Sequence, residues 1–494
     1  SFPSWGSGDP LAWLEAALVA AASAGLLLVA ARHLWALRWS LSRDRASALP
    51  LPRGSMGWPF FGETLHWLIQ GSHFHSSRRQ RYGAVFKTHL LGKPVVRVSG
   101  AENVRKILLG EHRLVSAQWP LSTQILLGSH TLLNAHAEAH RHRRKVSGAG
   151  GTDGSAHPSC PAGVAVYASA KALTFRIAAR ILLGLRLEEE QFEELSGAFE
   201  QLVENLFSLP LNVPFSGLRK GIKARDLLHT YMEKAILEKL QRKDPDAHRD
   251  ALDFIINSQR TREQGRETTM EEKEPNINIM AKVSQDMVHG TTNGPSSLSR
   301  LEETGQFFSS LERSEYCCHP YLTLEKLDRL RYLDCVIKEV LRLLPPVSGG
   351  YRTALQTFEL DGYQIPKGWS VMYSIRDTHE TASIYQSPPD TFDPERFWVS
   401  PEDQEEHKTS ASLRFHYIPF GGGVRNCIGK ELAKAILKML AIELVSTASW
   451  ELATAHFPKM QTVPIVHPVD DLQLYFHSLK AGHESSGGTG KVNA

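Results

Sequence analysis

The longest apolar run of the chain lies near its start. Residues 16–31 carry no charge and are almost all apolar, and extension back to Leu11 adds a single interruption, Glu15. At about 1.5 Å per residue, a helix over 11–31 spans roughly 30 Å, the thickness of a bilayer core. The pattern therefore predicts a transmembrane anchor at 11–31, preceded by a short tail over 1–10.

Charges beside this run set its expected orientation. Only Asp9 precedes the run, whereas arginines follow it at Arg32, Arg38, Arg43 and Arg45. The positive-inside rule then places residues 1–10 in the lumen and the chain after the anchor in the cytosol. A cleaved secretory signal carries its basic residues before the apolar run, so the pattern favours a retained anchor. Residues 32–59, which are basic and rich in Pro and Gly, are expected to form a stiff hinge.

After the hinge, the spacing of apolar positions is mostly helical. Alternation between 81 and 99 predicts paired strands, and a short strand region returns between 356 and 374. Helical spacing dominates elsewhere, over 164–187, 188–207, 218–242, 324–344 and 430–447. The sequence therefore predicts a mainly α domain with a small β portion over 60–480, followed by a disordered tail over 481–494.

Two stretches break this pattern. Residues 147–163 are rich in Gly, Ser and Pro and have no period, and residues 261–320 are polar with no sustained apolar face. Because helices in proteins are stabilised mainly by burial of an apolar face, both stretches are expected to be irregular.

Composition and charge narrow the class of protein. Of 494 residues, 42% are hydrophobic and 22% are charged, which is typical of a globular chain. The 56 basic and 53 acidic residues leave a net charge of +3, so nucleic acid is not an expected partner. The five cysteines are odd in number and lack Cys-x-x-Cys spacing, which favours a reduced, cytosol-facing domain over a disulfide framework. The numbered chain opens on Ser1, so we expect it to lack the start of the translation product.

One cysteine stands in a loop with distinctive chemistry, which reads PFGGGVRNCIGK over 419–430. Its three consecutive glycines let the backbone turn tightly and approach a flat ligand. Cys427 precedes a predicted helix, whose partly positive N-terminus stabilises a thiolate. Arg425 offers a cation to an acidic group at a cofactor edge, Phe420 can pack beside the sulfur, and Gly429 leaves space for a macrocycle. A buried, inert cysteine in a Gly-rich turn is the plain alternative.

The loop resembles that of the cytochromes P-450. Their pattern Phe-x-x-Gly-x-Arg-x-Cys-x-Gly is matched at Phe420, Gly423, Arg425, Cys427 and Gly429. The resemblance implies the cytochrome P-450 fold behind an N-terminal transmembrane helix. It also implies haem b as cofactor, with Cys427 as the axial thiolate ligand of the iron.

Three further residues carry the same resemblance. Glu339 and Arg342 lie three apart on a predicted helix, and Arg396 stands in the segment Pro-Glu-Arg-Phe upstream of the cysteine loop. Alone, the first two would be an ordinary solvated helix pair. Cytochromes P-450 join such residues in a buried network, so the resemblance implies a structural role for all three.

Cations near the haem are implied in the same way. His140 and Arg144 lie four apart in the basic run EAHRHRRK, where a solvated cationic helix is the plain alternative. The family places a ring donor and an arginine with this spacing against a haem propionate. Arg352 follows Pro345 and Pro346, which end the predicted helix, and it is a further candidate for binding a haem propionate.

Longer stretches resemble the retinoic acid hydroxylases of family 26, and within them the C-type branch. They include GSMGWPFFGETLHWL, LLGEHRLVSAQWP and QTVPIVHPVD. The resemblance implies an elongated apolar acid, retinoic acid, as substrate. The candidate pocket residues, each of which also fits an ordinary core position, are Trp119, Phe207, Pro346, Val347 and Pro464. Arg97 is a candidate partner for the substrate carboxylate, although an arginine in an alternating strand more often faces solvent.

The sequence departs from the family in one region. Cytochromes P-450 carry a long distal helix across the haem, and the polar stretch between 256 and 324 predicts that this helix is missing or replaced. Gly290-Thr291-Thr292 resembles its centre, so Thr291 and Thr292 are the candidate catalytic residues. Asn293, Gly294 and Pro295 follow directly and would end a helix.

The resemblance as a whole implies a haem-thiolate monooxygenase that hydroxylates retinoic acid. Electrons are expected from NADPH through a cytochrome P-450 reductase. The expected place is the endoplasmic reticulum membrane, with lipid around a single anchor and the catalytic domain in the cytosol. A sterol or fatty-acid hydroxylase of the same superfamily is one alternative. A catalytically dead remnant, because the distal helix is absent, is the other.

Overall fold

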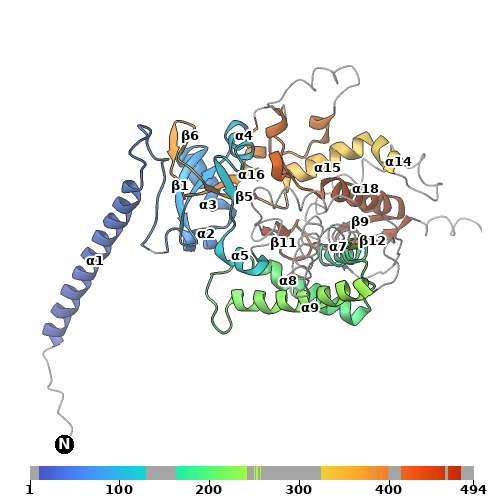
Figure 1. Ribbon diagram of the computed structural model, residues 1–494, viewed down its shortest axis with the longest axis horizontal. Helices are drawn as coiled ribbons and strands as arrows, with labels where there is room; N and C mark the ends of the chain where they lie inside the picture. The colour runs from blue at the N-terminus through green and yellow to red at the C-terminus, as the bar shows by residue number, and fades with distance from the viewer. Residues whose placement is uncertain are drawn as a thin grey trace, which may run out of the picture. The chain divides into compact units, whose positions relative to one another are not determined.

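The structure is a computed structural model, drawn as a ribbon in Figure 1. It describes residues 10–59, 61–128, 163–241, 250, 252–253, 256, 324–382, 384–385, 387–398, 413–461 and 466–479. Contacts group the chain into two units. Unit 1 holds Ser1–Val98 and Thr353–Met372, and unit 2 holds Ser99–Arg352 and Tyr373–Ala494.

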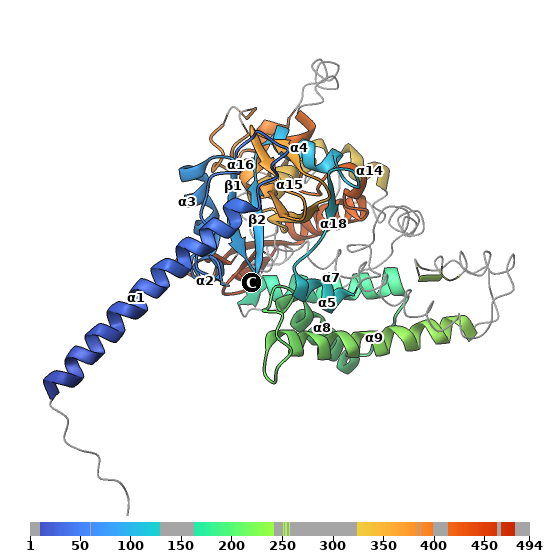
Figure 2. The ribbon, with the colours of Figure 1, turned by 60° about the vertical axis from the view of Figure 1, so that its left-hand side comes forward.

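Unit 1 begins with α1 (Pro10–Leu41), a helix of 32 residues. Its segment Trp13–Leu41 is long and apolar enough to cross a membrane, and its most apolar part is not buried. The helix continues beyond residue 31, where the sequence predicts the anchor to end. No Gly or Pro occurs between Arg32 and Leu41, and Leu, Ala and Arg are strong helix formers. Figure 2 shows the N-terminal part of α1 standing clear of the strands of its unit.

A helical pair and a hairpin follow in unit 1. The elements are α2 (Thr64–Gln70), α3 (Ser72–Tyr82), β1 (Val85–Leu90) and β2 (Lys93–Val98). The two strands pair antiparallel from Val85↔Val98 to Leu90↔Lys93, which confirms the strands predicted between 81 and 99. Leu91 and Gly92 form the two-residue turn with φ of 51° and 78°, and two positive φ angles match the right-handed twist of a hairpin.

The second segment of unit 1 supplies more strands. β6 (Phe358–Leu360) and β7 (Tyr363–Ile365) form a small hairpin, and the strand region predicted between 356 and 374 is thereby confirmed. Two longer strands, β5 (Gly349–Ala354) and β8 (Ser370–Ser374), belong partly to this unit. They continue its sheet in the order β1-β2-β8-β5.

The C-terminal end of α1 is docked onto this sheet through aromatic side chains. Trp39 lies 5.4 Å from the His89 ring and 6.1 Å from the Trp369 ring, measured between centroids. Trp35 lies 5.1 Å from the same His89 ring and donates a hydrogen bond from Nε1 to the Met56 carbonyl oxygen at 3.2 Å. Arg38 covers both tryptophans, at 5.6 and 5.4 Å. We call Trp35, Arg38, Trp39, His89 and Trp369 the anchor-end cluster.

Unit 2 is mostly helical. One apolar core is built by helices whose buried faces include Leu126, Phe175, Leu202, Leu228 and Ile236. In both ribbon views α8 and α9 lie side by side along this core (Figures 1 and 2). The helices are α4 (Ala101–Leu109), α5 (Leu121–Leu127), α7 (Val166–Leu183), α8 (Glu189–Glu204) and α9 (Gly217–Gln241). The helices predicted over 164–187, 188–207 and 218–242 are thereby confirmed.

A second core in unit 2 joins three helices: α14 (Leu324–Arg329), α15 (Arg331–Leu343) and α18 (Lys430–Thr447). Leu327, Leu333, Val340 and Leu437 are among its buried residues. The buried ammonium of Lys438 ties these helices together, because it donates to the Leu327 carbonyl oxygen at 2.8 Å and pairs with Asp334 at 2.9 Å. The helix predicted over 324–344 is divided at residue 330, where the backbone leaves the helical region.

Short elements complete unit 2. β3 (Val115–Ala117) precedes α5, α16 (Ile375–Glu380) follows β8, and β9 (Ala448–Leu452) pairs with β12 (Gln473–Ser478) and through it with β4 (Val164–Ala165). The remaining short elements are β10 (Met460–Gln461), β11 (His467–Pro468) and the 3-10 turns η3 (Pro394–Phe397), η4 (Leu413–Phe415) and η5 (Gly423–Arg425). The predicted class, mainly α with a small β portion, is confirmed.

Candidate functional site

The cysteine loop folds around its glycines. Gly421 and Gly423 have φ of 69° and 65°, in the left-handed region that favours glycine. A Cβ on Gly423 would stand 2.3 Å from the Leu108 carbonyl oxygen, so this backbone approach excludes every other residue. The Cys427 amide then donates to the Phe420 carbonyl oxygen at 2.8 Å, which closes the loop.

Cys427 is held where a thiolate can form. It is half-buried, outside any disulfide, and lies three residues before the first residue of α18. The partly positive end of that helix favours the anionic form of the sulfur. Near it in the sequence, the apolar side chains of Val424 and Ile428 are exposed, by 54% and 37%.

The space beside the loop fits a flat macrocycle. Apart from the glycine itself and its two chain neighbours, no atom of the described residues lies within 4 Å of the position that a Cβ would take on Gly429. A haem with acidic edge groups requires a ligand for its iron, apolar contacts for its ring and cations for its edge. Unit 2 supplies a thiol at a helix N-terminus, exposed apolar groups near it in the sequence and buried arginines. The residues present therefore fit the haem implied by the sequence.

Two predicted cofactor-binding arginines meet on a carboxylate that the sequence did not single out. Arg352 Nε lies 2.6 Å from Glu111 Oε2, and Arg425 Nε lies 2.6 Å from Glu111 Oε1. The amide of Ala117 also donates to Oε1, at 3.0 Å. Burial lowers the pKa of the Arg425 guanidinium, and the Glu111 charge opposes that shift. Glu111, Arg352 and Arg425 are called the Glu111 cluster below.

The predicted structural network consists of close, buried contacts. Arg342 donates to both Glu339 oxygens at 2.7 and 2.8 Å, and Arg396 Nε lies 3.1 Å from Glu339 Oε1. The Asp393 amide donates to the same oxygen at 3.0 Å. Arg342 also donates to the Pro389 carbonyl oxygen at 2.7 Å, so α15 is joined to the segment around η3. Glu339 and Arg342 are fully buried, and loss of one partner would leave a buried charge unpaired.

A histidine outside the predicted set connects this network to the cysteine loop. His379 of α16 is fully buried; its Nδ1 lies 3.1 Å from the Arg342 carbonyl oxygen, and its Nε2 accepts from the Ile418 amide at 2.9 Å. These partners require a neutral ring with the proton on Nδ1. Burial, helped by the nearby Arg342 charge and opposed by the hydrogen bond to the Arg342 carbonyl, lowers the pKa of His379 to about 3. A lone histidine carries no sequence signal for this role.

Two of the predicted substrate residues lie together. Trp119 lies 6.4 Å from Phe207, and both are near Tyr351, at 5.6 and 6.2 Å between ring centroids. We call these three rings the aromatic triangle. Tyr351 was missed by the sequence reading, and it directly precedes Arg352 of the Glu111 cluster. Pro346 is half-buried and Val347 is exposed in the segment after α15.

The remaining predicted residues fall elsewhere. Arg97 lies on β2 in unit 1 and is buried rather than solvent-facing, with Nη1 3.1 Å from the Met372 sulfur. Five candidates lie outside the described residues: His140, Arg144, Thr291, Thr292 and Pro464. The stretches 147–162 and 261–320, including the region of the distal helix, also lie outside them.

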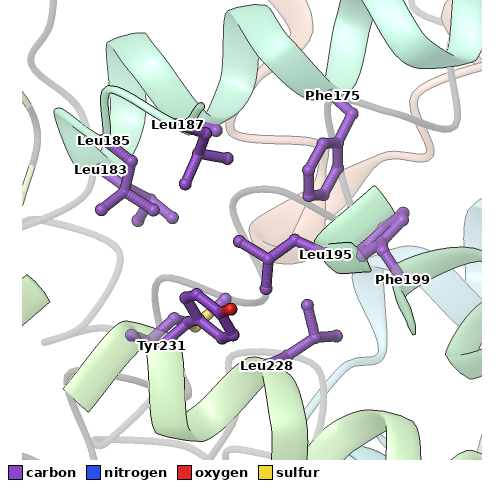
Figure 3. Close-up of a pocket in the computed structure, with 10 residues that line it drawn as sticks. Phe175, Leu183, Leu185, Leu187, Leu195, Phe199, Leu228 and Tyr231 are labelled. Atoms are coloured by element: carbon purple, nitrogen blue, oxygen red, sulfur yellow. The ribbon is translucent and has the colours of Figure 1, made fainter. Parts of the chain in front are cut away.

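A small apolar cavity in unit 2 is a different feature. Residues of α7, α8 and α9 point toward one another around it, among them Phe175, Leu195, Phe199 and Leu228 (Figure 3). It offers about 20 Å³, room for a single water-sized molecule and far too little for a haem or an elongated acid. The cavity therefore does not mark the cofactor or substrate site.

Comparison with known proteins gives the class of this chain. The family model described as Cytochrome P450 matches residues 318–475, which contain α15, the cysteine loop and α18. A curated relative is 60% identical and covers 97% of the chain. The chain belongs to the cytochrome P450 family.

Individual relatives narrow the comparison. The 60% identical protein is Cytochrome P450 26C1 of Homo sapiens, aligned over 519 residues and 98% of its own length. Cytochrome P450 26B1 of Xenopus tropicalis is 50% identical, over 97% of this chain and 96% of that protein. A solved structure described as retinoic acid bound cyanobacterial CYP120A1 is 30% identical with a TM-score of 0.74, and covers 88% of this chain and 100% of that one. Family and relatives together make the chain a cytochrome P450 monooxygenase.

Proposed function

We propose that this protein is a haem-thiolate monooxygenase that hydroxylates retinoic acid. The observation that carries the substrate is the retinoic acid bound to the cyanobacterial relative, whose whole length this chain matches. The similarity to Cytochrome P450 26C1 and 26B1 over nearly the full chain supports the same assignment. A sterol or fatty-acid hydroxylase stays the alternative within the family.

The cofactor site is assigned to residues of unit 2. Cys427 ligates the iron, and Phe420, Gly423 and Gly429 shape the loop against the macrocycle. Haem held by a thiolate supplies the activation of dioxygen and the insertion of oxygen into a C–H bond. Arg352 and Arg425 face the acidic edge of the cofactor, and the candidates His140 and Arg144 would add to them.

Substrate-binding roles are proposed for apolar residues of unit 2 and, separately, for one cation of unit 1. The aromatic triangle supports the roles of Trp119 and Phe207, because large rings bury an extended polyene over a wide area. Pro346, Val347 and Pro464 are the further wall candidates. Arg97 is the proposed carboxylate partner, since a buried guanidinium is a strong partner for a carboxylate.

The membrane and redox partners are proposed from the sequence and α1. The length and apolar surface of α1 support a membrane anchor, with 1–10 in the lumen and the haem domain over 60–480 in the cytosol. We assign the membrane to the endoplasmic reticulum. Electrons come from NADPH through a membrane-bound reductase, and Thr291 and Thr292 are the candidates for the catalytic distal residues.

The test uses the full chain with haem. Wild-type protein should give the carbon-monoxide-bound ferrous spectrum of a thiolate-ligated haem, and Cys427→Ala should lose it. Survival of that band in the variant would identify another ligand. All-trans retinoic acid should shift the Soret band, and Trp119→Ala should weaken the shift. A shift with a sterol and none with retinoic acid would favour the alternative substrate class.

A haem protein without turnover is the second candidate. The observation behind it is the polar sequence of 261–320, where Glu271-Glu272-Lys273-Glu274 could not enter a dry pocket without a large desolvation cost. Reconstitution with reductase, NADPH and retinoic acid separates the two. Hydroxylated product at a rate that matches NADPH consumption supports the enzyme, and NADPH loss without product supports the inactive chain.

A further inference from the structure

Glu111 occupies an unusual position in unit 2. It lies between the C-terminal end of α4 and β3, yet its side chain is only 2% exposed. Its two partners come from distant parts of the sequence, Arg352 from β5 and Arg425 from the cysteine loop, and their side chains are 6% and 7% exposed. A buried carboxylate is costly unless it is fully partnered, and each carboxylate oxygen here receives a guanidinium Nε–H.

The charges of this cluster do not balance. One carboxylate faces two guanidinium groups, so the Glu111 cluster carries one excess positive charge in a buried place. The field of Arg352 also acts against the charge on Arg425. Since a buried excess charge is unfavourable, the arrangement favours an additional anion.

The guanidinium geometry leaves capacity for such an anion. A guanidinium has five N–H donors, and Glu111 engages the Nε side of each arginine. Each terminal nitrogen carries two N–H donors, so a guanidinium can reach a second carboxylate while Nε stays on Glu111. Arg352 Nη1 uses one of its donors for the Tyr351 carbonyl oxygen, at 2.9 Å. Two carboxylates at the edge of one cofactor are what a haem presents.

We propose that Glu111 is a positioning residue for the cofactor: it holds Arg352 and Arg425 side by side so that both meet the haem propionates. This inference rests on the proposed function. The carboxylate keeps two like charges together before haem binds, and it sets the net charge at the haem edge afterwards. Through the Ala117 amide, Glu111 also fixes β3, the strand that leads to Trp119 of the aromatic triangle.

The first test is Glu111→Gln, which keeps the shape of the side chain and removes its charge. We expect haem to leave the variant about tenfold faster, equivalent to about 1.4 kcal/mol, when it is captured by an excess of apo-globin. The midpoint potential of the remaining haem should become more positive, because loss of a negative charge favours the reduced state. A purely structural carboxylate would lower the haem content without moving this potential.

Glu102→Gln is the matched control. Glu102 lies in the first turn of α4 in the same unit, 69% exposed and 3.6 Å from Arg105, so both measurements should equal those of the wild type. The spectrum of the wild-type protein is the reference for the proposed function. If the wild-type protein lacks the spectrum of a thiolate-ligated haem, the proposed function is wrong. If wild type has it and Glu111→Gln keeps both the release rate and the potential, only the role of Glu111 is wrong.

If Glu111→Gln does not fold, a second variant still tests the proposal. Glu111→Asp keeps the charge and shortens the reach, so it should release haem faster while its potential stays near the wild-type value. Release at the wild-type rate would overturn the positioning role. Arg352→Gln and the double variant Glu111→Gln/Arg352→Gln complete a double-mutant cycle on the rate of haem release. Glu111→Gln should change this rate less in the Arg352→Gln protein than in the wild type. Equal changes in the two proteins would contradict a coupling between Glu111 and Arg352.

Discussion

At the scale of single residues, the cysteine loop depends on one backbone approach more than on any side chain. Gly423 lies against the Leu108 carbonyl oxygen of α4, with φ of 65°. A side chain there would both strain the backbone and push α4 away from the loop. The position of the cysteine sulfur is thus fixed by a helix that carries none of the predicted cofactor residues.

Gly423→Ala is expected to lower the free energy of unfolding by about 2 kcal/mol or more, because backbone strain and a steric clash add. Denaturant unfolding of the haem-loaded protein measures the change. Gly197→Ala is the control, since Gly197 is exposed in the middle of α8 and alanine should raise stability there by about 0.5–1 kcal/mol. Equal effects at the two sites would contradict the role of the Leu108 contact.

Two buried histidines should make the protein sensitive to acid. Burial lowers the pKa of His379 to about 3 and that of His89 to about 4, both below the usual value of 6.5. The unfolded chain therefore binds more protons between these values, and stability is lost as the pH falls below 6.5. Each histidine contributes a slope of up to about 1.4 kcal/mol per pH unit.

His379→Gln should flatten this acid slope. A glutamine amide can donate and accept as the neutral ring does, but it does not titrate. Unfolding midpoints between pH 4.5 and pH 7 measure the slope, and His477→Gln, at an exposed histidine of β12, should leave it unchanged. An unaltered slope in His379→Gln would mean that His379 is already charged in the folded protein.

At the scale of elements, the end of α1 is part of the fold of unit 1. Ala31, Trp35 and Trp39 are half-buried at a spacing of four, one face of a helix, while the neighbouring positions are exposed. Arg38 lies over the two tryptophans. Burial, and after it the Arg38 charge, lowers the pKa of the nearby His89 to about 4, so its ring is neutral near pH 7. The helix α1 therefore has two parts: an apolar part that is not buried, and a C-terminal end that packs on other residues of unit 1.

Trp39→Ala should detach this end of the helix. Loss of a half-buried indole is expected to cost about 1–2 kcal/mol, less than for a fully buried ring. Hydrogen exchange at β1 should become faster, and the pKa of His89 should rise toward 6.5. Leu37→Ala is the control, because Leu37 lies on the exposed face of the same turn. Unchanged exchange in Trp39→Ala would show that the cluster does not hold α1.

Elements with a long apolar period could be predicted from the sequence, and those fixed by distant partners could not. The boundaries of α18 match the prediction because a continuous apolar face and a Gly-rich start define them. Short helices such as α2 and α5 are too brief for a period to be detected. In the site, Cys427 is marked by a local motif, whereas Glu111, Tyr351 and His379 gain their roles from residues far along the chain, which no spacing reveals.

At the scale of the whole molecule, removal of residues 1–49 should move the protein out of the membrane fraction that resists alkaline extraction. The segment removed contains the helix that is apolar enough to span a bilayer. Full retention in that fraction would require a second spanning segment.

A shorter deletion provides the matched comparison. Removal of residues 1–31 takes away the predicted anchor but keeps the docked end of α1, including Trp35 and Trp39. This form should also leave the membrane, and it should melt at a higher temperature than the 1–49 deletion, which strips the aromatic cover from His89 and Trp369. Equal melting temperatures would mean that the cover adds no stability.

The docked end of α1 has a mechanical consequence for the proposed membrane anchor. A spanning helix tilts when the hydrocarbon layer is thinner than its apolar length. In α1 the helix runs without a break from the apolar segment to Trp39, so a tilt at one end acts as a lever on the hairpin at the other. If α1 spans a bilayer as proposed, a change in bilayer thickness is therefore expected to act on unit 1. The lipid composition of a vesicle should then alter hydrogen exchange at β1 in the full chain but not after residues 1–31 are removed.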